Sequence, residues 1–156
     1  TLEEVVGSAL RMLEPGLGGR HIQLALPDPL LLVHVDGPLF ERVLINLLEN
    51  AIKYAGPQAE IGIDAHVEDE HLQLDVWDNG PGIPQGQEQR VFDKFSRGNK
   101  ESAVPGVGLG LAICRAIVEV HGGSIAVYNR PQGGACFRVT LRQDAPPELE
   151  DFHEDM

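Results

Sequence analysis

The sequence predicts an α+β fold, a two-layer sandwich in which helices cover one face of a largely antiparallel or mixed sheet. Two periodicities support this prediction, because apolar residues recur at helical spacing in some segments and alternate with polar residues in others. The 156 residues suit one domain with a single core, and 42% apolar with 23% charged residues is the composition of a globular protein. No stretch approaches the ~20 uninterrupted apolar residues that a bilayer span needs.

Three segments have apolar residues at helical spacing and stop close to glycine or proline: residues 1–14, 38–54 and 108–121. The middle segment is the strongest, since six apolar residues recur along one of its faces: Phe40, Val43, Leu44, Leu47, Leu48 and Ala51. We therefore expect three amphipathic helices.

Short alternating or apolar runs predict the strands: residues 21–26, 30–35, 61–67, 72–77, 124–129 and 135–142. The acidic Glu68-Asp-Glu70 between two of these runs favours a hairpin turn. Residues 79–107 are rich in glycine and proline and are read as a loop, with one short helical stretch near residues 87–93.

Charge and cysteine content narrow the function classes. Lys and Arg total 12 against 24 Asp and Glu, and the net charge of −12 argues against nucleic acid as a partner. Six of the acids lie in residues 144–156 without a basic residue, so we expect a disordered acidic tail after a domain at 1–143. Cys114 and Cys136 lack metal-ligand spacing, which favours free, buried thiols in a reducing compartment.

The predicted helix 38–54 has polar residues along the side opposite its apolar stripe: Arg42, Asn46, Glu49, Asn50 and Lys53. Such a stripe can be an ordinary solvated helix face. Two asparagines one turn apart are unusual there, because asparagine is a poor interior helix former. An amide carbonyl is a suitable hard ligand for Mg²⁺, and a lysine one turn further on can neutralise phosphate. Both interpretations stay open on this feature alone.

Two glycine motifs follow. Asp78-Asn-Gly80-Pro-Gly82 comes directly after an apolar strand, so that a carboxylate stands at the strand end, although the motif alone also fits a simple turn. Gly106-Val-Gly108-Leu-Gly110-Leu111 starts the last predicted helix, where unpaired N–H groups favour an anion. The leucine at 111 excludes a dinucleotide fingerprint, and the lack of a GxxxxGKS/T motif excludes a P-loop fold.

Four motifs occur in order along the chain: Asn46-Leu-Leu-Glu-Asn50-Ala-Ile-Lys53-Tyr54, Asp78-x-Gly80-x-Gly82, Phe92-Asp-Lys-Phe95 with Arg97, and Gly106-x-Gly108-Leu-Gly110-Leu111. In this order and spacing they resemble the N, G1, F and G2 boxes of the ATP-binding domain of bacterial sensor histidine kinases. The resemblance covers about residues 1–143 and implies a Bergerat-type fold, with about three helices on a mixed, mostly antiparallel five-stranded sheet. Within the family, the residues at 37–44 and 152–156 are similar to those of potassium-responsive sensor kinases.

This resemblance implies ATP and Mg²⁺ as ligands. The family's pattern places Asn50 on Mg²⁺ and Asn46 beside it in the same polar layer. Lys53 would approach the phosphates, and Tyr54 would lie near the sugar and base. Asp78 would accept a hydrogen bond from the exocyclic amine of adenine and so select ATP over GTP.

The loops would complete the implied nucleotide site. Gly80 and Gly82 would let the backbone pass beside the adenine ring, with Ile83 among its apolar walls. Residues 96–105 would be a mobile lid tethered by Phe92 and Phe95. The further nucleotide-binding residues implied are Arg97 or Lys100 at the terminal phosphate, Gly106, Val107, Gly108, Leu109, Gly110, Leu111 and Thr140.

The sequence departs from the family's commonest pattern at two positions. Val107 stands where Ser or Thr is frequent, and Ala135 replaces a frequent Thr near the last strand. A hydroxyl on the phosphate side and one on the adenine side are therefore missing, whereas main-chain contacts should tolerate both changes.

The implied catalytic residues are Asn46, Asn50, Lys53 and Arg97. Related ATPases of the gyrase, chaperone and mismatch-repair types carry a glutamate where this sequence has Asn46. An amide cannot act as a general base at neutral pH, whereas a neutral imidazole needs none, so phosphoryl transfer to histidine fits better than hydrolysis. None of the six histidines has the context of a phosphate acceptor, and we expect the acceptor upstream of Thr1, in a longer parent chain.

The expected function is that of a protein-histidine kinase module. It would bind Mg-ATP and donate the γ-phosphate to the dimerisation and histidine-phosphotransfer domain of its parent, for onward transfer to a response regulator. The resemblance also implies a cytoplasmic domain of a membrane-bound homodimer in the bacterial inner membrane. Two alternatives remain, a non-catalytic nucleotide-sensing module and a gyrase-like ATPase fragment.

Overall fold

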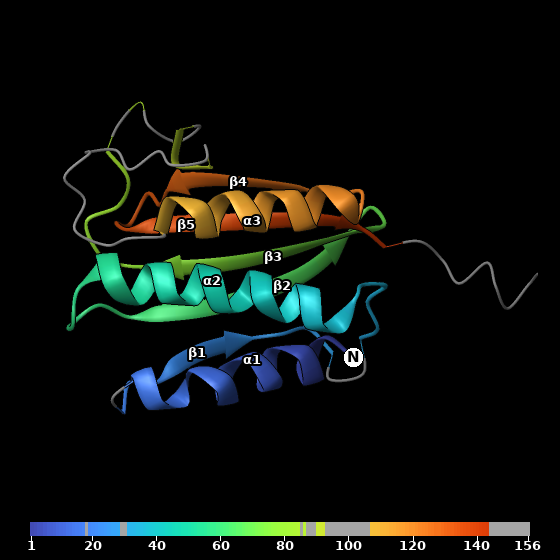
Figure 1. Ribbon diagram of the computed structural model, residues 1–156, viewed down its shortest axis with the longest axis horizontal. Helices are drawn as coiled ribbons and strands as arrows, with labels where there is room; N and C mark the ends of the chain where they lie inside the picture. The colour runs from blue at the N-terminus through green and yellow to red at the C-terminus, as the bar shows by residue number, and fades with distance from the viewer. Residues whose placement is uncertain (18, 29–30, 85, 87–89, 93–106, 144–156) are drawn as a thin grey trace, which may run out of the picture.

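Three helices and five strands form two layers in the residues that the structure describes, which are 1–17, 19–28, 31–84, 86, 90–92 and 107–143. The structure is a computed structural model. In Figure 1 the helices lie side by side across one face of the sheet. In chain order the elements are α1 (Leu2–Leu17), β1 (Ile22–Ala25), α2 (Gly37–Ala55), β2 (Ile61–Glu68), β3 (His71–Asp78), the short 3-10 helix η1 (Arg90–Phe92), α3 (Val107–Val120), β4 (Ser124–Asn129) and β5 (Ala135–Arg142).

The strands follow the order β1-β2-β3-β5-β4 across the sheet. β1 pairs with β2 in parallel and all other neighbours pair antiparallel, so the sheet is mixed and mostly antiparallel. This confirms the predicted fold class. The predicted hairpin is also confirmed, because β2 and β3 are joined through Asp69 and Glu70, whose φ angles of 54° and 62° are the left-handed values of a two-residue type I′ turn.

The strand predicted at residues 30–35 is wrong in its described part, residues 31–35, which belong to no strand. The Leu31 carbonyl accepts a hydrogen bond from the Leu2 N–H at 2.9 Å, and the Leu32 carbonyl accepts one from the Gln143 side-chain amide at 2.5 Å. These partners belong to α1 and to the chain after β5, not to a neighbouring strand. The alternation in the sequence reflects alternate side chains that pack against the core: Leu31, Val33 and Val35.

Two helical segments also differ from their predicted bounds. α1 continues through Pro15 to Leu17, because Leu17 packs against the core and so favours another turn. The helical stretch predicted near 87–93 is a single 3-10 turn, Arg90–Phe92, in the part that is described. The predicted tail at 144–156 lies outside the described residues.

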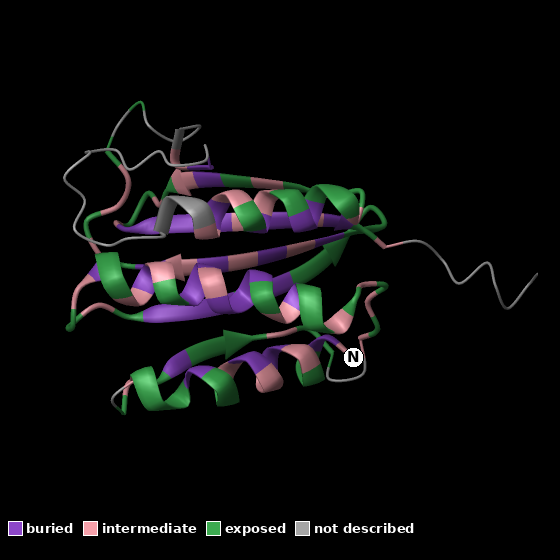
Figure 2. Ribbon diagram, in the orientation of Figure 1, coloured by how far each residue is buried: buried purple, intermediate pink, exposed green. Residues whose placement is uncertain are grey.

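The core lies between the helix layer and the sheet, where Figure 2 shows the buried residues on facing surfaces. α2 runs between α1 and α3 over the middle of the sheet (Figure 1), and its whole predicted apolar stripe is buried. The sheet contributes alternate residues of β3 and β5: Leu72, Leu74, Val76, Phe137, Val139 and Leu141. Because successive side chains of a strand point to opposite faces, the residues between them form the outer face of the sheet.

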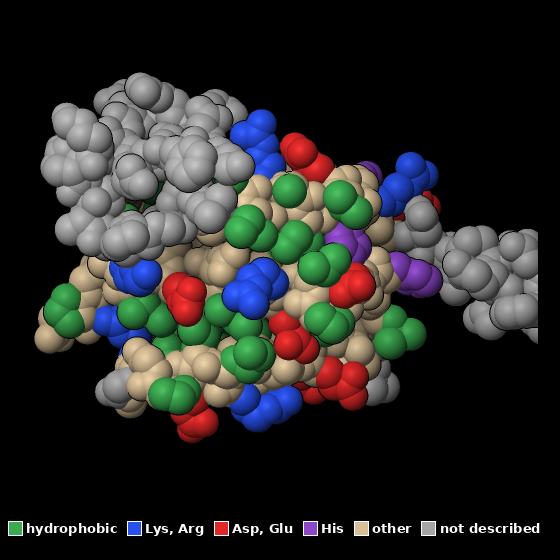
Figure 3. Space-filling model, in the orientation of Figure 1, with side chains coloured by type: hydrophobic (Ala, Val, Ile, Leu, Met, Phe, Trp, Pro, Cys, Tyr) green, Lys and Arg blue, Asp and Glu red, His purple; other side chains and the backbone are tan. Residues whose placement is uncertain are grey.

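The outside of the helix layer carries several hydrophobic side chains among scattered charges (Figure 3). Large exposed ones on α2 and α3 are Leu39, Tyr54, Ile113 and Val120. Among the described helices, none has the length and apolar character that crossing a bilayer would require.

The start of α2 is fixed by its N-cap and by the end of α3. The carboxylate of Asp36 accepts a hydrogen bond from the Leu39 N–H at 3.0 Å, which caps the helix. The Asp36 N–H donates to Nε2 of His121 at 2.9 Å, while Nδ1 of His121 lies 2.8 Å from the Ile117 carbonyl. Since a carbonyl can only accept, the ring proton is on Nδ1, and the imidazole joins the two helices as acceptor and donor.

Replacement of Asp36 by alanine should lower the free energy of unfolding by about 1 kcal/mol, because the first turn of α2 loses its capping acceptor. Asp36→Asn is the matched control, since asparagine keeps an oxygen acceptor at the cap. Urea unfolding followed by circular dichroism measures both variants. Equal stability of the alanine and asparagine variants would show that the cap contributes nothing.

Candidate functional site

Asp78, the last residue of β3, is the one charged residue that is buried in the described part of the chain, with 7% of its surface exposed. Its Oδ1 accepts hydrogen bonds from the N–H groups of Gly80 at 2.9 Å and Ala135 at 3.3 Å. The two donors come from different segments, the loop after β3 and the start of β5. Both hydrogen bonds that the described residues donate to this carboxylate end on Oδ1.

Glycines let three backbone segments meet around Asp78. A Cβ on Gly80 would lie 2.6 Å from Cα of Ala55, so only glycine lets this loop pass beside the end of α2. A Cβ on Gly134 would overlap the main-chain oxygen of Asp78, and its φ of 95° also favours glycine. The loop after β3, the turn before β5 and the end of α2 are therefore neighbours.

The polar side of α2 reaches this end of the fold. Asn46 is half-buried and donates from Nδ2 to the carbonyl of Gly110, in the first turns of α3, at 3.3 Å. Asn50 is half-buried one turn further along, and Lys53 and Tyr54 are exposed near the end of α2. Figure 1 shows the end of α2, the start of α3 and the end of β3 at the same side of the molecule.

The structure thus brings together most of the predicted site residues that it describes: Asn46, Asn50, Lys53, Tyr54, Asp78, Gly80, Gly82, Ile83 and Gly110. Val107, Gly108 and Leu109 form the first turn of α3. The side chain of Leu111 is buried and belongs to the core, so it is not available to contact a ligand.

The predicted lid, residues 96–105, lies outside the described residues, and so do Phe95 and Gly106. Arg97 and Lys100 belong to this lid. Its other predicted tether, Phe92, is buried and packs edge-on against Phe137 of β5, with ring centroids 5.9 Å apart. Phe92 itself is therefore fixed in the core.

Thr140 does not lie at the end of the sheet that contains Asp78. It pairs with Gln73 near the start of β3, whereas Asp78 is the last residue of that strand. Its side chain also alternates onto the outer face, opposite to that of Val139. The structure therefore gives no support for Thr140 as a nucleotide-binding residue.

Two residues that the sequence did not indicate lie against the same loop. Asn129 forms hydrogen bonds with both the N–H and the carbonyl of Ile83, and Arg130 donates to the main-chain oxygen of Asp78. In the sequence they precede Pro131 and two glycines and look like part of an ordinary turn, so no local signal distinguishes them.

Both cysteines are free and buried, as the sequence predicts. Burial raises the pKa of Cys114 to about 12, and its Sγ lies 3.7 Å from the carbonyl of Val43 on α2. Burial likewise raises the pKa of Cys136 to about 11. Neither thiol is a nucleophile at neutral pH.

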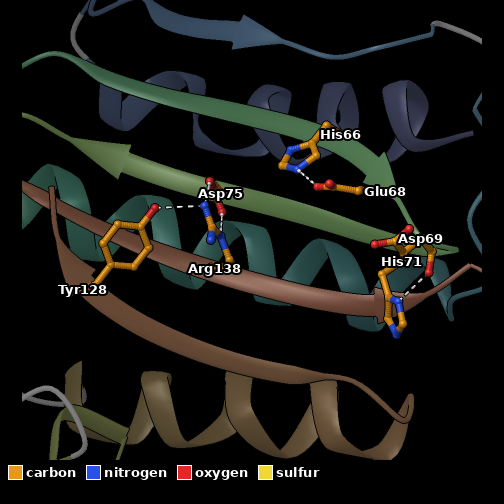
Figure 4. A network of polar contacts seen from close by, with 7 residues as sticks. All are labelled: His66, Glu68, Asp69, His71, Asp75, Tyr128 and Arg138. Carbon is orange, nitrogen blue, oxygen red and sulfur yellow. Dashed lines mark hydrogen bonds and ion pairs between the residues drawn. The ribbon is translucent and has the colours of Figure 1, made fainter. Parts of the chain in front are cut away.

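The outer face of the sheet carries a separate polar network, shown in Figure 4. Arg138 donates two hydrogen bonds to the Asp75 carboxylate, at 2.9 and 3.0 Å, and a third to the Tyr128 hydroxyl at 3.0 Å. The bonds to Asp75 raise the pKa of Arg138, and burial raises that of Tyr128 to about 12. Because Asp75 points to the face opposite Asp78, this network joins β3, β5 and β4 without entering the candidate site.

Comparisons with known proteins agree with this geometry. Residues 35–145 match the family described as histidine kinase-, DNA gyrase B- and HSP90-like ATPase. Over its full length the chain is 81% identical to the sensor protein KdpD of Escherichia coli (strain K12), of which it covers 17%. It is 37% identical to the KdpD of Clostridium acetobutylicum over 92% of this chain and 16% of that protein. The chain spans about one sixth of the length of these two relatives.

Solved structures of histidine kinases have the same fold. The mycobacterial sensor histidine kinase MprB has a TM-score of 0.80 at 28% identity, covering 90% of this chain and 95% of that one. The catalytic domain of histidine kinase ThkA has a TM-score of 0.77 at 30% identity, covering 91% of this chain and 94% of that one. ThkA in complex with the response regulator protein TrrA has a TM-score of 0.77 at 27% identity, covering 92% of this chain and 41% of the ThkA chain.

The raised pKa values of the two thiols predict a loss of stability in alkaline solution. Unfolded thiols ionise near pH 9.0, whereas the folded ones stay protonated to about 12 and about 11. The unfolded state therefore releases protons first, so the stability contributed by the thiols is complete below about pH 9 and is lost as the pH rises towards 11 or 12.

Urea unfolding at several pH values between about 8 and about 11 measures this loss. The matched variant replaces both Cys114 and Cys136 by alanine. It should be less stable near neutral pH but show a shallower decline above pH ~9. An equally steep decline without the thiols would assign the effect to other groups, such as Tyr128.

Proposed function

Because the chain belongs to the histidine kinase-, DNA gyrase B- and HSP90-like ATPase family, we propose that it binds Mg-ATP and donates the γ-phosphate to a histidine outside this chain. The relatives and structural neighbours reported above are named as sensor proteins or histidine kinases, which favours transfer to histidine over a gyrase-like ATPase or a purely nucleotide-sensing module. The whole parent protein, its substrates and its partners are part of the proposal.

The observation that carries the proposal is the buried Asp78 carboxylate. A buried carboxylate is costly unless it is hydrogen-bonded, and the two backbone N–H groups on Oδ1 supply part of that compensation. Oδ2 can accept the exocyclic amine of adenine. Guanine has a carbonyl oxygen at the corresponding position, which would face the carboxylate without a proton between them. The site therefore favours ATP over GTP.

The phosphates would lie between the polar side of α2 and the start of α3. Lys53 near the end of α2 supplies a positive charge, and the first N–H groups of α3 favour an anion. Arg97 or Lys100 of the proposed lid would reach the terminal phosphate from residues 96–105.

The donor set on α2 fits Mg²⁺ held jointly with a nucleotide. The described residues contain no group of three or more His, Cys, Asp or Glu that could hold a metal ion by themselves. Mg²⁺ is commonly held by few protein ligands together with substrate phosphates, and the amide oxygen of Asn50 is such a ligand. When bound, the ion neutralises developing charge on the phosphates.

Asn46 determines which reaction the site favours. Its amide donates to the Gly110 carbonyl and cannot remove a proton from water at neutral pH. An acceptor imidazole already presents a lone pair, so alignment and charge neutralisation suffice for transfer. In this chain, Nε2 of His121 is occupied by the Asp36 N–H, and no other histidine has an acceptor context in the sequence.

The proposed partners follow from this reaction. The acceptor would be the dimerisation and histidine-phosphotransfer domain of the parent, and the phosphate would pass to a response regulator, the class of protein found with ThkA. We further propose a catalytic domain at 1–143 with an acidic tail at 144–156, on the cytoplasmic side of a homodimer in the bacterial inner membrane. Potassium sensing by the parent rests on the similarity to potassium-responsive kinases at 37–44 and 152–156.

Asp78→Asn should weaken ATP binding ten- to a hundredfold, about 1.5–3 kcal/mol, because a charge-assisted hydrogen bond to the base is lost. Isothermal titration calorimetry with Mg-ATP and Mg-GTP measures the change and the selectivity. Asp69→Asn is the matched control, since Asp69 is an exposed turn residue at the opposite end of β3. Equal ATP affinity in wild type and the Asp78 variant would remove this carboxylate from the site.

Incubated alone with γ-labelled ATP, the chain should show neither an acid-labile phosphoprotein nor fast phosphate release. Addition of a separate acceptor hairpin should give labelling of that hairpin. Asn50→Ala should reduce this transfer by about a hundredfold or more, since a metal ligand is lost, with little change in thermal stability. Glu49→Ala, on the exposed neighbouring position of α2, is the control.

Stoichiometric self-phosphorylation of residues 1–156 would contradict the proposal. So would rapid hydrolysis that depends on Asn46, because it would show that the domain activates water. An Asn50 variant that unfolds easily but transfers phosphate normally would assign that residue to stability alone.

A further inference from the structure

Asn129, the last residue of β4, forms hydrogen bonds with the loop that follows Asp78. Oδ1 of Asn129 accepts a hydrogen bond from the Ile83 N–H at 2.8 Å, and Nδ2 donates to the Ile83 carbonyl at 3.0 Å. The amide side chain thus pairs with one backbone residue through both of its polar ends. Gly82, with φ of 86°, permits this approach, because a Cβ there would lie 2.5 Å from Oδ1 of Asn129.

The next residue, Arg130, forms a hydrogen bond with the other end of the same loop, at Asp78. Its Nη1 donates to the main-chain oxygen of Asp78 at 2.9 Å and to that of Gly133 at 3.3 Å. The guanidinium carbon lies 4.3 Å from the centroid of the Trp77 ring, within the range of a cation–π contact. One side chain therefore connects the end of β3 with the turn before β5.

The support beneath Arg130 is itself fixed to the sheet. The indole N–H of Trp77 donates to Oδ1 of Asp64 on β2 at 3.1 Å. Trp77 also covers Gly62, where any Cβ would overlap the indole. Arg130 therefore packs on a ring that two strands hold in place.

Residues 78–83 are the segment that most needs such support. The loop contains two glycines, whose conformational freedom makes ordering costly, and it must present Asp78 and Ile83 in one arrangement to a base. A loop that is already ordered in the free protein binds its ligand more tightly, because it loses less conformational entropy on binding.

Resting on the proposed ATP-binding function, we propose that Asn129 and Arg130 are positioning residues for base recognition. Together they hold the first and last residues of the 78–83 loop. They act through Asp78 and Ile83 and contact no nucleotide themselves. Their effect should therefore appear in recognition of adenine and be absent from recognition of the phosphates.

The test uses Asn129→Asp, Arg130→Gln and Arg130→Lys, with Gln132→Ala on the exposed tip of the same turn as the matched control. Asn129→Asp is nearly isosteric but turns the Nδ2 donor into an oxygen that faces the Ile83 carbonyl. Calorimetry with Mg-ATP, Mg-GTP and Mg-tripolyphosphate separates base from phosphate binding. Amide exchange of Ile83 without nucleotide reports the loop directly, and thermal unfolding checks each variant.

We expect Asn129→Asp and Arg130→Gln to lose about tenfold in ATP affinity, and their preference for ATP over GTP, with tripolyphosphate affinity unchanged. Arg130→Lys keeps the charge and can still donate hydrogen bonds, so it should lose less ATP affinity. The Ile83 amide should exchange faster in Asn129→Asp. Gln132→Ala should match wild type throughout.

Unchanged ATP affinity and selectivity in a folded Asn129→Asp variant would overturn the inference. A parallel loss of ATP and tripolyphosphate binding would do the same, because it would indicate general destabilisation. If Arg130→Gln does not fold, the test relies on Arg130→Lys and on Asn129→Asp, which changes an exposed residue. A wild type without ATP preference would overturn the proposed function itself, whereas a selective wild type with unaffected variants rejects only the positioning roles.

Discussion

The carboxylate of Asp78 lies buried where three backbone segments meet, and a buried charge constrains everything around it. Its Oδ1 needs the N–H groups of Gly80 and Ala135, so the loop after β3 and the start of β5 must approach it closely. That approach leaves no space for a Cβ at Gly80 or Gly134. The glycines, the strand register and the end of α2 are arranged around this one group.

The two faces of the sheet have different tasks. The face under the helices contains the apolar core and ends at Asp78, so that the core and the candidate site are continuous. On the outer face, contacts between described side chains join neighbouring strands. Arg138 joins Asp75 to Tyr128 there, as Figure 4 shows, and Trp77 with Arg130 extends support to the end of β3.

α2 serves the core and the site with opposite sides of one helix. Its apolar side is buried in the middle of the fold, which fixes the rotation of the helix about its axis. The same rotation directs Asn46 to α3 and places Asn50 and Lys53 towards the same end as Asp78. A polar residue on this helix is therefore positioned by the packing of apolar residues on its other side.

The sequence by itself determined the three helices, the hairpin at Asp69 and Glu70, the polar side of α2 and the carboxylate at the end of β3. These features depend on periodicity, turn residues and motif spacing, all of which are local along the chain. Tertiary structure decided which segments pair and which side chains meet. It left residues 31–35 outside the sheet, placed Thr140 on the outer face far from Asp78, and brought Asn129 and Arg130 to the loop at 78–83. Contacts between residues about fifty positions apart depend on strand order and register, which no local pattern specifies.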